Sequence, residues 1–521
     1  MSRKLLSCIL ALMLTLGCIS ISAAGAADAA EPVTIKMTAV LHPNTQNLGE
    51  LPIYQAISEK TGVNIEWTCY TSNDWSEKKN LMFASGDLPD AFFGRYALTE
   101  SDIQANTDYF VALEDIITAQ CPNIQNMYAA YPDAATVNVF ADGHTYAVGH
   151  VMPARPSTYG AIYINQAWLD ALQLATPTTI DELTDVLRAF KDGGDLNGDG
   201  DANEIPFTIS DLDSVNFGSR IFLGSFGVYD SIDSWLALDD EGNVIYNPVQ
   251  EGYRKYIAWL NTLYSEQLMD NEALTHDFAG FKAKTRLTEN EIIGLQVCWS
   301  LDTINNDNYT LLLPVTGPDG DQMISANSTY NKLGTDNYNC FSITINNPDP
   351  EATMRWVDEF YSDEYGIQAY YGAYDSALGV NENGEIYQLD PPDDYTLNSW
   401  AWTVGMNDNF VGYVSKEIES KLVFNDIYST TGRSKLDDDE KYLPYTDESH
   451  NFPHVTLTQE ENEEIALLST DIDSIRSEYA ARWVTEGGVD EQWDEYLGRL
   501  NDAGLTRYLE IYQTAYQRLK G

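Results

Sequence analysis

Positively charged side chains are scarce in this chain. Its 521 residues include 29 lysines and arginines against 80 aspartates and glutamates, which gives a formal net charge of −51. A surface of this sign repels phosphate backbones and anionic lipid headgroups, so the composition argues against binding to nucleic acid or to acidic membrane surfaces. The same charge favours solubility and the binding of cations.

Cysteine and histidine are also scarce. Cys69, Cys121, Cys298 and Cys340 remain in any mature form, and their wide spacing matches neither a disulfide scaffold nor a zinc motif. One pair could still form a bridge outside the cell, or all four could be buried free thiols. The chain also lacks a glycine-rich phosphate loop, a dinucleotide fingerprint and a GxSxG motif, so the sequence offers no nucleotide site and no nucleophile elbow.

Long apolar runs are absent after the N-terminus. The run Leu5–Leu16 follows two basic residues and is too short to span a bilayer comfortably, so residues 1–26 are predicted to be a secretory signal. Gly17-Cys18 resembles a lipobox, with Cys18 as the lipidated residue, whereas Ala24-Gly25-Ala26 fits an ordinary cleavage site. Either form lies outside the cytoplasmic membrane, anchored by lipid in the first case and secreted in the second.

Aromatic residues are abundant. The chain has 11 tryptophans and 33 tyrosines, and its 44% of hydrophobic residues is too high for a disordered protein. These rings could serve ordinary packing, or they could form flat surfaces on which the apolar faces of sugar rings stack while nearby polar groups bind the hydroxyls.

Oxygen-bearing side chains alternate along residues 195–206. A calcium ion takes six to eight oxygen ligands, and Gly200 stands sixth in the loop, where an EF-hand-like turn needs a residue that tolerates positive φ. Pro206 occupies the position of the usual last glutamate, so Glu204 is the substitute. A solvated acidic turn is the alternative. The pattern predicts a structural Ca²⁺ site made by Asp195, Asn197, Asp199, Asp201, Asn203 and Glu204.

Several segments resemble one known family. They are Tyr163-Ile-Asn-Gln-Ala-Trp168-Leu-Asp, Pro177-Thr-Thr-Ile-Asp-Glu-Leu183 with a helix capped by Thr178 or Thr179, Ser85-Gly-Asp-Leu-Pro-Asp90, and Ala141-Asp-Gly-His-Thr-Tyr146. Together with the calcium loop, they resemble the family-1 extracellular solute-binding proteins of bacterial ABC importers, in particular the lipoprotein type that binds oligosaccharides.

This resemblance implies a fold and a division of the chain. The fold is α/β, with two lobes of the periplasmic-binding-protein type II-like kind, hinge crossings and a helical C-terminal extension. Crossings are expected near residues 151–159, 294–300 and 340–346. Lobe 1 would then comprise residues 33–152 plus 299–342, and lobe 2 residues 153–298 plus 343–521, including the calcium loop 195–206 and the helical tail.

The resemblance also implies a ligand site between the lobes, at the carboxyl ends of the strands. The residues expected there are His42, Asn44, Arg95, Tyr96, Tyr159 and Trp299, to which Trp75, Trp400 and Trp402 are added as aromatics in irregular segments. Trp299 is expected to stack on a sugar ring. Packing roles are expected instead for Trp168, Trp235, Trp259 and Trp356.

The implied function is that of a monomeric receptor, not an enzyme. It would capture a carbohydrate, in particular an oligosaccharide, and deliver it to the permease subunits of an ABC importer. One alternative is a secreted glycoside hydrolase, which needs two carboxylates roughly 5–9.5 Å apart across a sugar cleft. Another is a peptide-binding receptor, whose site would use main-chain contacts more than aromatic planes.

Overall fold

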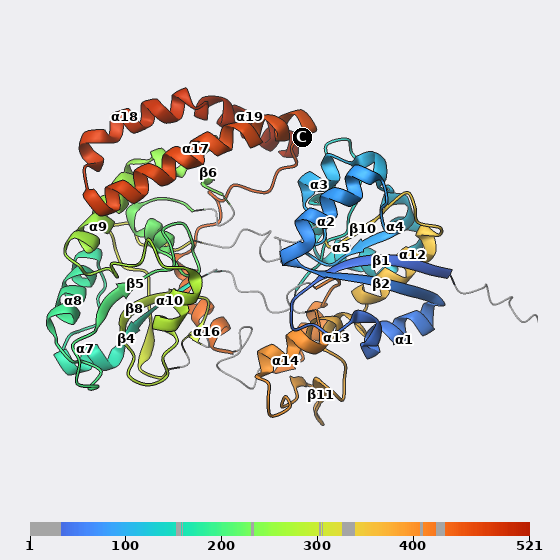
Figure 1. Ribbon diagram of the computed structural model, residues 1–521, viewed down its shortest axis with the longest axis horizontal. Helices are drawn as coiled ribbons and strands as arrows, with labels where there is room; N and C mark the ends of the chain where they lie inside the picture. Colours follow the sequence, from blue (N-terminus) through green and yellow to red (C-terminus); the bar gives the residue numbers. More distant parts are fainter. Residues whose placement is uncertain are drawn as a thin grey trace, which may run out of the picture.

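The structure is a computed structural model. It describes residues 33–152, 158, 160–230, 234–301, 304, 306–325, 339–406, 410–423 and 433–520. Two bodies lie side by side, each with its own sheet and its own hydrophobic core (Figure 1). We call them lobe 1 (residues 33–152 and 339–423) and lobe 2 (residues 160–325 and 433–520). The predicted two-lobed α/β fold is therefore observed.

Lobe 1 is built on a four-stranded sheet. Its order is β10 (Phe341–Ile343), β3 (Ala91–Phe93), β1 (Val33–Leu41) and β2 (Val63–Thr71). The strands β1, β2 and β3 are parallel, and β10 is antiparallel to β3. Both faces of the sheet are buried, because alternate residues of β1 enter two different apolar clusters: Met37 and Ala39 join one, and Val40 joins the other.

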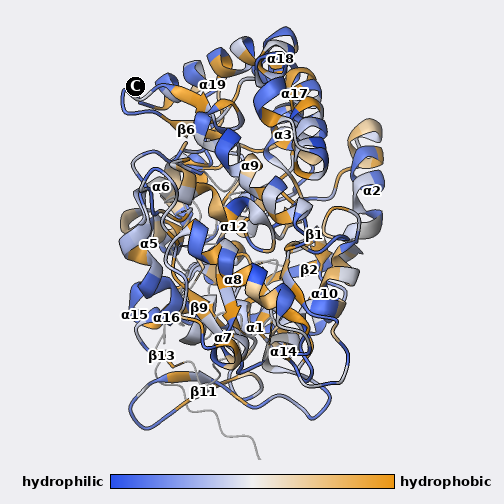
Figure 2. Ribbon diagram, turned by 90° about the vertical axis from the view of Figure 1, so that its left-hand side faces the viewer, coloured by the Kyte–Doolittle hydropathy of each residue, from blue (hydrophilic) through white to orange (hydrophobic). Residues whose placement is uncertain are grey.

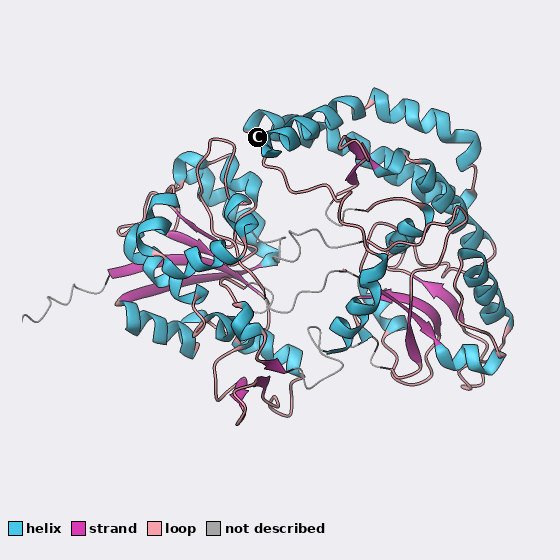
Figure 3. Ribbon diagram, turned by 180° about the vertical axis from the view of Figure 1, so that it is seen from behind, coloured by secondary structure: helices cyan, strands magenta, loops and turns pink. Residues whose placement is uncertain are grey.

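Helices cover both faces of this sheet (Figure 3). One of them, α1 (Pro52–Thr61), begins at a proline, which suits the first turn of a helix. It ends before Gly62, whose φ of 71° is typical of a left-handed helix cap. The helices of lobe 1 are α1 (Pro52–Thr61), α2 (Ser72–Ser85), α3 (Glu100–Gln104), α4 (Glu114–Gln120), α5 (Pro122–Ala130), α6 (Pro132–Thr136), α12 (Pro350–Asp358), α13 (Gly366–Tyr371), α14 (Leu397–Val404) and α15 (Lys416–Glu419), and β11 (Leu378–Val380), β12 (Ile386–Gln388) and β13 (Leu422–Val423) form a small separate sheet.

Lobe 2 is built on a mixed sheet. Its order is β5 (Ile205–Thr208), β8 (Ile293–Cys298), β4 (Ala161–Asn165) and β9 (Tyr309–Leu312). Only β5 and β8 are parallel neighbours. The remaining elements of this part are α7 (Gln166–Leu172), α8 (Ile180–Asp192), the 3₁₀ helix η3 (Ser219–Phe226), the hairpin β6 (Leu236–Leu238) and β7 (Val244–Tyr246), α9 (Glu251–Ser265), α10 (Phe278–Thr285) and α16 (Arg433–Tyr442).

The C-terminal extension consists of α17 (Gln459–Glu486), α18 (Val489–Asp502) and α19 (Leu505–Lys520). Figure 2 shows hydrophobic and hydrophilic bands alternating along these helices, as in amphipathic helices. Trp483 of α17 lies 5.0 Å from Tyr496 of α18, centroid to centroid, which joins the two helices. The side-chain amide of Asn261 in α9 donates to the carbonyl oxygen of Val484 at 3.0 Å and fixes the extension to lobe 2. No helix in the described part of the chain is both long and apolar enough to cross a membrane.

The chain passes between the lobes three times. The passages lie between Met152 and Gly160, between Ser325 and Asn339, and between Val423 and Arg433. The first agrees with the predicted crossing at 151–159. The predicted crossing at 294–300 is wrong, because that run forms β8, a central and fully buried strand of lobe 2. The third predicted crossing, 340–346, contains β10 of lobe 1.

The division of the chain consequently differs from the one expected from sequence. Residues 299–325 belong to lobe 2, where Leu312 and Ile324 join the core. Residues 343–423 lie in lobe 1, where Trp356 packs 5.9 Å from Phe93 of β3. An apolar run indicates that a strand is buried, but it does not indicate to which of two sheets the strand belongs.

Candidate functional site

The predicted calcium loop joins the end of α8 to the start of β5. Thr179 caps α8 by accepting a hydrogen bond from the amide of Glu182, one of the two caps predicted. Gly198 and Gly200 have φ values of 80° and 100°, which allow the chain to curl. The Asp195 carboxylate lies inside this curl and accepts the amides of both glycines, at 2.7 and 3.0 Å.

Hydrogen bonds within the loop hold the side chains of its acidic residues. The Oε1 atom of Glu204 accepts the amides of Leu196 and Asn197, at 2.5 and 3.2 Å. The side-chain amides of Asn197 and Asn203 both approach Oδ2 of Asp199, at 3.3 and 3.4 Å. The other oxygen of Glu204, Oε2, is buried and has no hydrogen-bond partner among the described residues. A buried carboxylate oxygen without a donor is costly, and a cation would satisfy it.

The donor set fits a hard cation in kind. Asp195, Asp199 and Glu204 supply carboxylates, and two asparagines supply amide groups within the same turn. In the described part of the chain, no group of three or more His, Cys, Asp and Glu side chains is close enough to hold a metal. In the loop, backbone amides donate to both oxygens of Asp195 and to Oε1 of Glu204.

The loop lies at the amino ends of β5 and β8. Ile205 begins β5 directly after it and donates its amide to the carbonyl oxygen of Ile292, and the side chain of Asn197 reaches the carbonyl of Asn290 at 3.4 Å. A ligand site at the carboxyl ends of these strands would lie at the opposite edge of the sheet. The position of the loop therefore favours a structural role.

At the carboxyl edge of lobe 2, Trp299 follows β8. Its indole is half-buried, and Nζ of Lys435 in α16 lies 4.7 Å from the ring centroid, a cation–π distance. Lys435 is only 1% exposed. The sequence analysis missed this lysine, because nothing in its local pattern indicates that α16 returns to the end of β8.

At the carboxyl edge of lobe 1, residues far apart in sequence meet. His42 follows β1, its Nδ1 accepts the amide of Asn44 at 3.2 Å, and its ring lies 4.7 Å from that of Trp402 in α14. Thr45 also donates its hydroxyl to the carbonyl oxygen of Trp402, at 2.7 Å. The structure thus brings three of the predicted ligand residues, His42, Asn44 and Trp402, into one cluster.

Two further predicted residues follow β3, the parallel neighbour of β1. Tyr96 is 43% exposed, and the guanidinium of Arg95 lies 4.7 Å from the centre of its ring. Because β1 and β3 run in parallel, Arg95 and Tyr96 end at the same edge of the sheet as His42. Trp400, in α14, donates its indole N–H to the carbonyl of Ser376, and its ring lies 5.0 Å from that of Tyr395.

Trp75 does not fit the predicted ligand role. It is 5% exposed, its indole N–H donates to the carbonyl of Ala97, and its ring packs 6.2 Å from Phe92 in the second core of lobe 1. The residue lies in α2 rather than in an irregular segment, and an apolar helix position explains its burial. Tyr159 lies outside the described residues.

Comparison with known proteins shows which family the chain resembles. The family model for bacterial extracellular solute-binding proteins matches residues 47–226. The chain is also 29% identical over 510 residues to the fructooligosaccharide ABC transporter substrate-binding protein FusA of Streptococcus pneumoniae serotype 4 (strain ATCC BAA-334 / TIGR4), an alignment that covers 94% of this chain and 91% of FusA. The chain is similar to bacterial extracellular solute-binding proteins.

Solved structures of solute-binding proteins share its fold. FusA of S. pneumoniae in complex with kestose superposes with a TM-score of 0.80 at 26% identity, covering 94% of this chain and 99% of FusA. A second FusA structure is of an EF-hand mutant in complex with fructo-nystose, with a TM-score of 0.79. An HMO-binding protein from Bifidobacterium longum infantis ATCC 15697 has a TM-score of 0.82 at 22% identity. This superposition covers 93% of the present chain and 98% of the Bifidobacterium protein.

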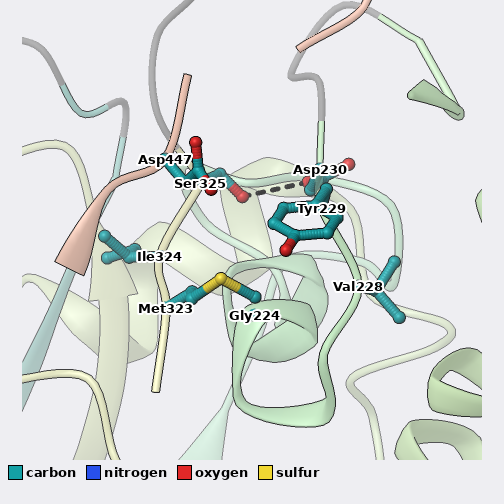
Figure 4. Close-up of a pocket in the computed structure, with 8 residues that line it drawn as sticks. All are labelled: Gly224, Val228, Tyr229, Asp230, Met323, Ile324, Ser325 and Asp447. Carbon is teal, nitrogen blue, oxygen red and sulfur yellow. Dashed lines mark hydrogen bonds between the residues drawn. The ribbon is translucent and has the colours of Figure 1, made fainter. Parts of the chain in front are cut away.

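A small pocket lies beside the second passage between the lobes (Figure 4). It is lined by Gly224, Val228, Tyr229, Asp230, Met323, Ile324, Ser325 and Asp447. Its volume of about 10 Å³ holds roughly one water molecule, so it is too small for a sugar. Its buried carboxylate, Asp230, accepts two N–H groups of Arg220 at 2.9 and 2.6 Å and the hydroxyl of Ser325 at 3.1 Å.

This ion pair is a structural anchor that the sequence analysis missed. Burial raises the pKa of Asp230, while Arg220 and Ser325 act in the opposite direction. Arg220 also stacks 4.0 Å from the ring centroid of Trp235, whose ring Arg476 of α17 approaches at 4.7 Å. The pair therefore links the part of lobe 2 that precedes the second passage to the C-terminal extension.

Proposed function

We propose that this chain is the receptor of an ABC importer and captures a carbohydrate between its two lobes. The observation that carries this proposal is its similarity to FusA over 94% of the chain, together with two lobes joined by three passages. FusA is named for fructooligosaccharide transport, so a short fructan is the first ligand to test. Hinge closure around the sugar would present the closed form to permease subunits. We propose that the receptor acts as a monomer.

The ligand residues proposed for this receptor lie at the carboxyl edges of the two sheets. His42, Asn44 and Trp402 form one cluster, and Arg95 and Tyr96 follow the neighbouring strand. On the facing lobe, Trp299 offers an aromatic plane beside the ammonium of Lys435. Planes flanked by N–H donors are the groups that bind the apolar faces and the hydroxyls of sugars. Trp400 and Tyr159 remain in the proposed set, and Trp75 leaves it.

A structural calcium ion is proposed for the loop 195–206. Asp195, Asn197, Asp199, Asn203 and Glu204 would supply side-chain oxygens, and Asp201 its backbone carbonyl. The buried and unsatisfied Oε2 of Glu204 supports the proposal, as does the EF-hand named for the mutant structure of FusA. When bound, the ion would neutralise three carboxylates that lie within one turn.

We further propose that the mature receptor is held at the outer face of the cytoplasmic membrane by a lipid on Cys18. The family is extracellular, and one relative, which matches 54% of this chain at 23% identity, is the lipoprotein LipO of Bacillus subtilis (strain 168). Cys18 lies outside the described residues. Mass spectrometry of the native N-terminus tests the anchor, and a mature chain that starts near Ala27 contradicts it.

Calorimetry with purified protein tests the carbohydrate function. The expected result is saturable binding of kestose or fructo-nystose without release of reducing sugar. Replacement of Trp299 by alanine should weaken binding by about 1–3 kcal/mol in a folded variant, because a large buried aromatic contact is lost. A protein that binds no member of a fructan and glycan library, or that hydrolyses one, contradicts the proposal.

A further inference from the structure

A group of aromatic side chains lies at the carboxyl edge of the lobe 2 sheet, beside the position of Trp299. The strands β5 and β8 are parallel and paired through Thr208 and Gln296, so both end at this edge. Two residues past the end of β5, the amide of Ser210 donates to the carbonyl oxygen of Phe217 at 2.7 Å. This hydrogen bond fixes Phe217 at the edge.

The first passage between the lobes reaches the same place. A Cβ atom on Gly160, directly before β4, would lie 2.4 Å from the carbonyl oxygen of Val215, so the loop that carries Phe217 touches the point where the chain enters lobe 2. At the same end of the sheet, Ala161 of β4 pairs with Cys298, the residue before Trp299. Phe217 and Trp299 therefore follow neighbouring strands on the side that the passages reach.

Helix α10 adds a second ring to this edge. His276, just before the helix, donates from Nε2 to the carbonyl oxygen of Ile209 at 2.8 Å, which ties the start of α10 to the end of β5. Phe278 then packs edge-on against Phe217, with ring centroids 5.1 Å apart, and Phe281 supports both rings from the buried side. We call Phe217, Phe278 and Lys282 the Phe278 surface.

The exposure of Phe278 distinguishes it from the other phenylalanines. It is 45% exposed, and it is the only strongly exposed phenylalanine in the described part of the chain. Nζ of Lys282 lies 4.9 Å from the centre of its ring, and no carboxylate of the described residues forms an ion pair with this ammonium. The surface thus presents an aromatic plane next to a hydrogen-bond donor, the combination that suits a sugar ring and its hydroxyls.

We propose that the Phe278 surface is a second sugar subsite, which binds the far end of a chain too long to be held by the Trp299 site alone. This proposal rests on the proposed carbohydrate function and adds a substrate class to it, namely oligosaccharides that extend along the edge of lobe 2. The subsite gives affinity for longer chains and is not used by the shortest ones.

Calorimetry with two fructans of different length tests this subsite. The trisaccharide kestose and the longer fructo-nystose are titrated into the full-length wild type and into Phe278→Ala, Lys282→Ala and Leu467→Ala. For Phe278→Ala, the affinity for fructo-nystose should fall about 10-fold, the loss that corresponds to one stacking contact, while that for kestose stays within about twofold. Lys282→Ala should give a smaller loss with the same length dependence.

The control is Leu467→Ala, which removes a side chain 75% exposed on α17, and it should bind both sugars as the wild type does. Lys282→Ala alters a solvent-facing ammonium and keeps the test decisive if Phe278→Ala fails to fold. Unchanged affinity of both variants for fructo-nystose, or an equal loss for both sugars, overturns the subsite and leaves the carbohydrate function standing. A wild type that binds neither sugar removes the fructan assignment and the subsite together.

Discussion

Replacement of Asp230 by alanine should be among the most destabilising single changes in lobe 2. The carboxylate of Asp230 is 1% exposed and the guanidinium of Arg220 7% exposed, so this ion pair is shielded from water. Removal of the carboxylate leaves the Arg220 charge buried beside the carbonyl oxygen of Ser234 and the ring of Trp235. Breaking a buried pair in this way typically costs about 3–5 kcal/mol of the free energy of unfolding.

Urea denaturation measures this cost, with midpoint and slope compared between variant and wild type. The matched control is Glu417→Ala, which breaks an i,i+4 pair with Lys421 whose side chains are 71% and 41% exposed, and it should cost at most about 0.5 kcal/mol. The double change Arg220→Met with Asp230→Leu should recover most of the loss, because no charge is then left buried. A loss below about 1 kcal/mol for Asp230→Ala, at an unchanged slope, would refute the reasoning.

Three further outcomes are expected. Added Ca²⁺ should raise the melting temperature and a chelator should lower it. The double variant Asp195→Asn with Glu204→Gln should lose this response without a change in sugar affinity. A response that persists in the variant excludes the loop as the calcium site. Trp75→Ala should lower the free energy of unfolding by about 3–5 kcal/mol, as the loss of a buried tryptophan does, whereas lost sugar binding at unchanged stability would restore its predicted ligand role. Burial raises the pKa of Asp358 to about 6, although N–H groups of residues 123 and 124 donate to its carboxylate. The folded state therefore holds this proton more tightly than the unfolded chain does. The free energy of unfolding should fall by roughly 2–3 kcal/mol as the pH rises from about 4 to 6. Asp358→Asn should remove that slope in urea titrations at several pH values, and an identical slope in the variant assigns it to other groups.

Local chemistry in the sequence was enough to locate many elements of this protein. In the first half of β1 apolar residues alternate with polar ones, and Gly62 adopts a left-handed conformation after α1; both features depend on residues close together in the chain. The loop 195–206 was predicted in the same way, from the spacing of its oxygen-bearing residues, and its calcium ion stays a proposal. Packing roles for Trp168, Trp259 and Trp356 were also correct, since all three are less than 9% exposed.

The assignment of segments to lobes depended on tertiary structure. The run before Trp299 reads as a buried strand in any sheet, and only its pairing with β4 and β5 shows that it stays in lobe 2. The meeting of His42 with Trp402, and of Trp299 with Lys435, joins positions more than a hundred residues apart. The hydrophobic effect does not depend on the orientation or identity of the partner group. A sequence can therefore indicate that a side chain is buried, but only the packing of distant elements decides which residues bury it.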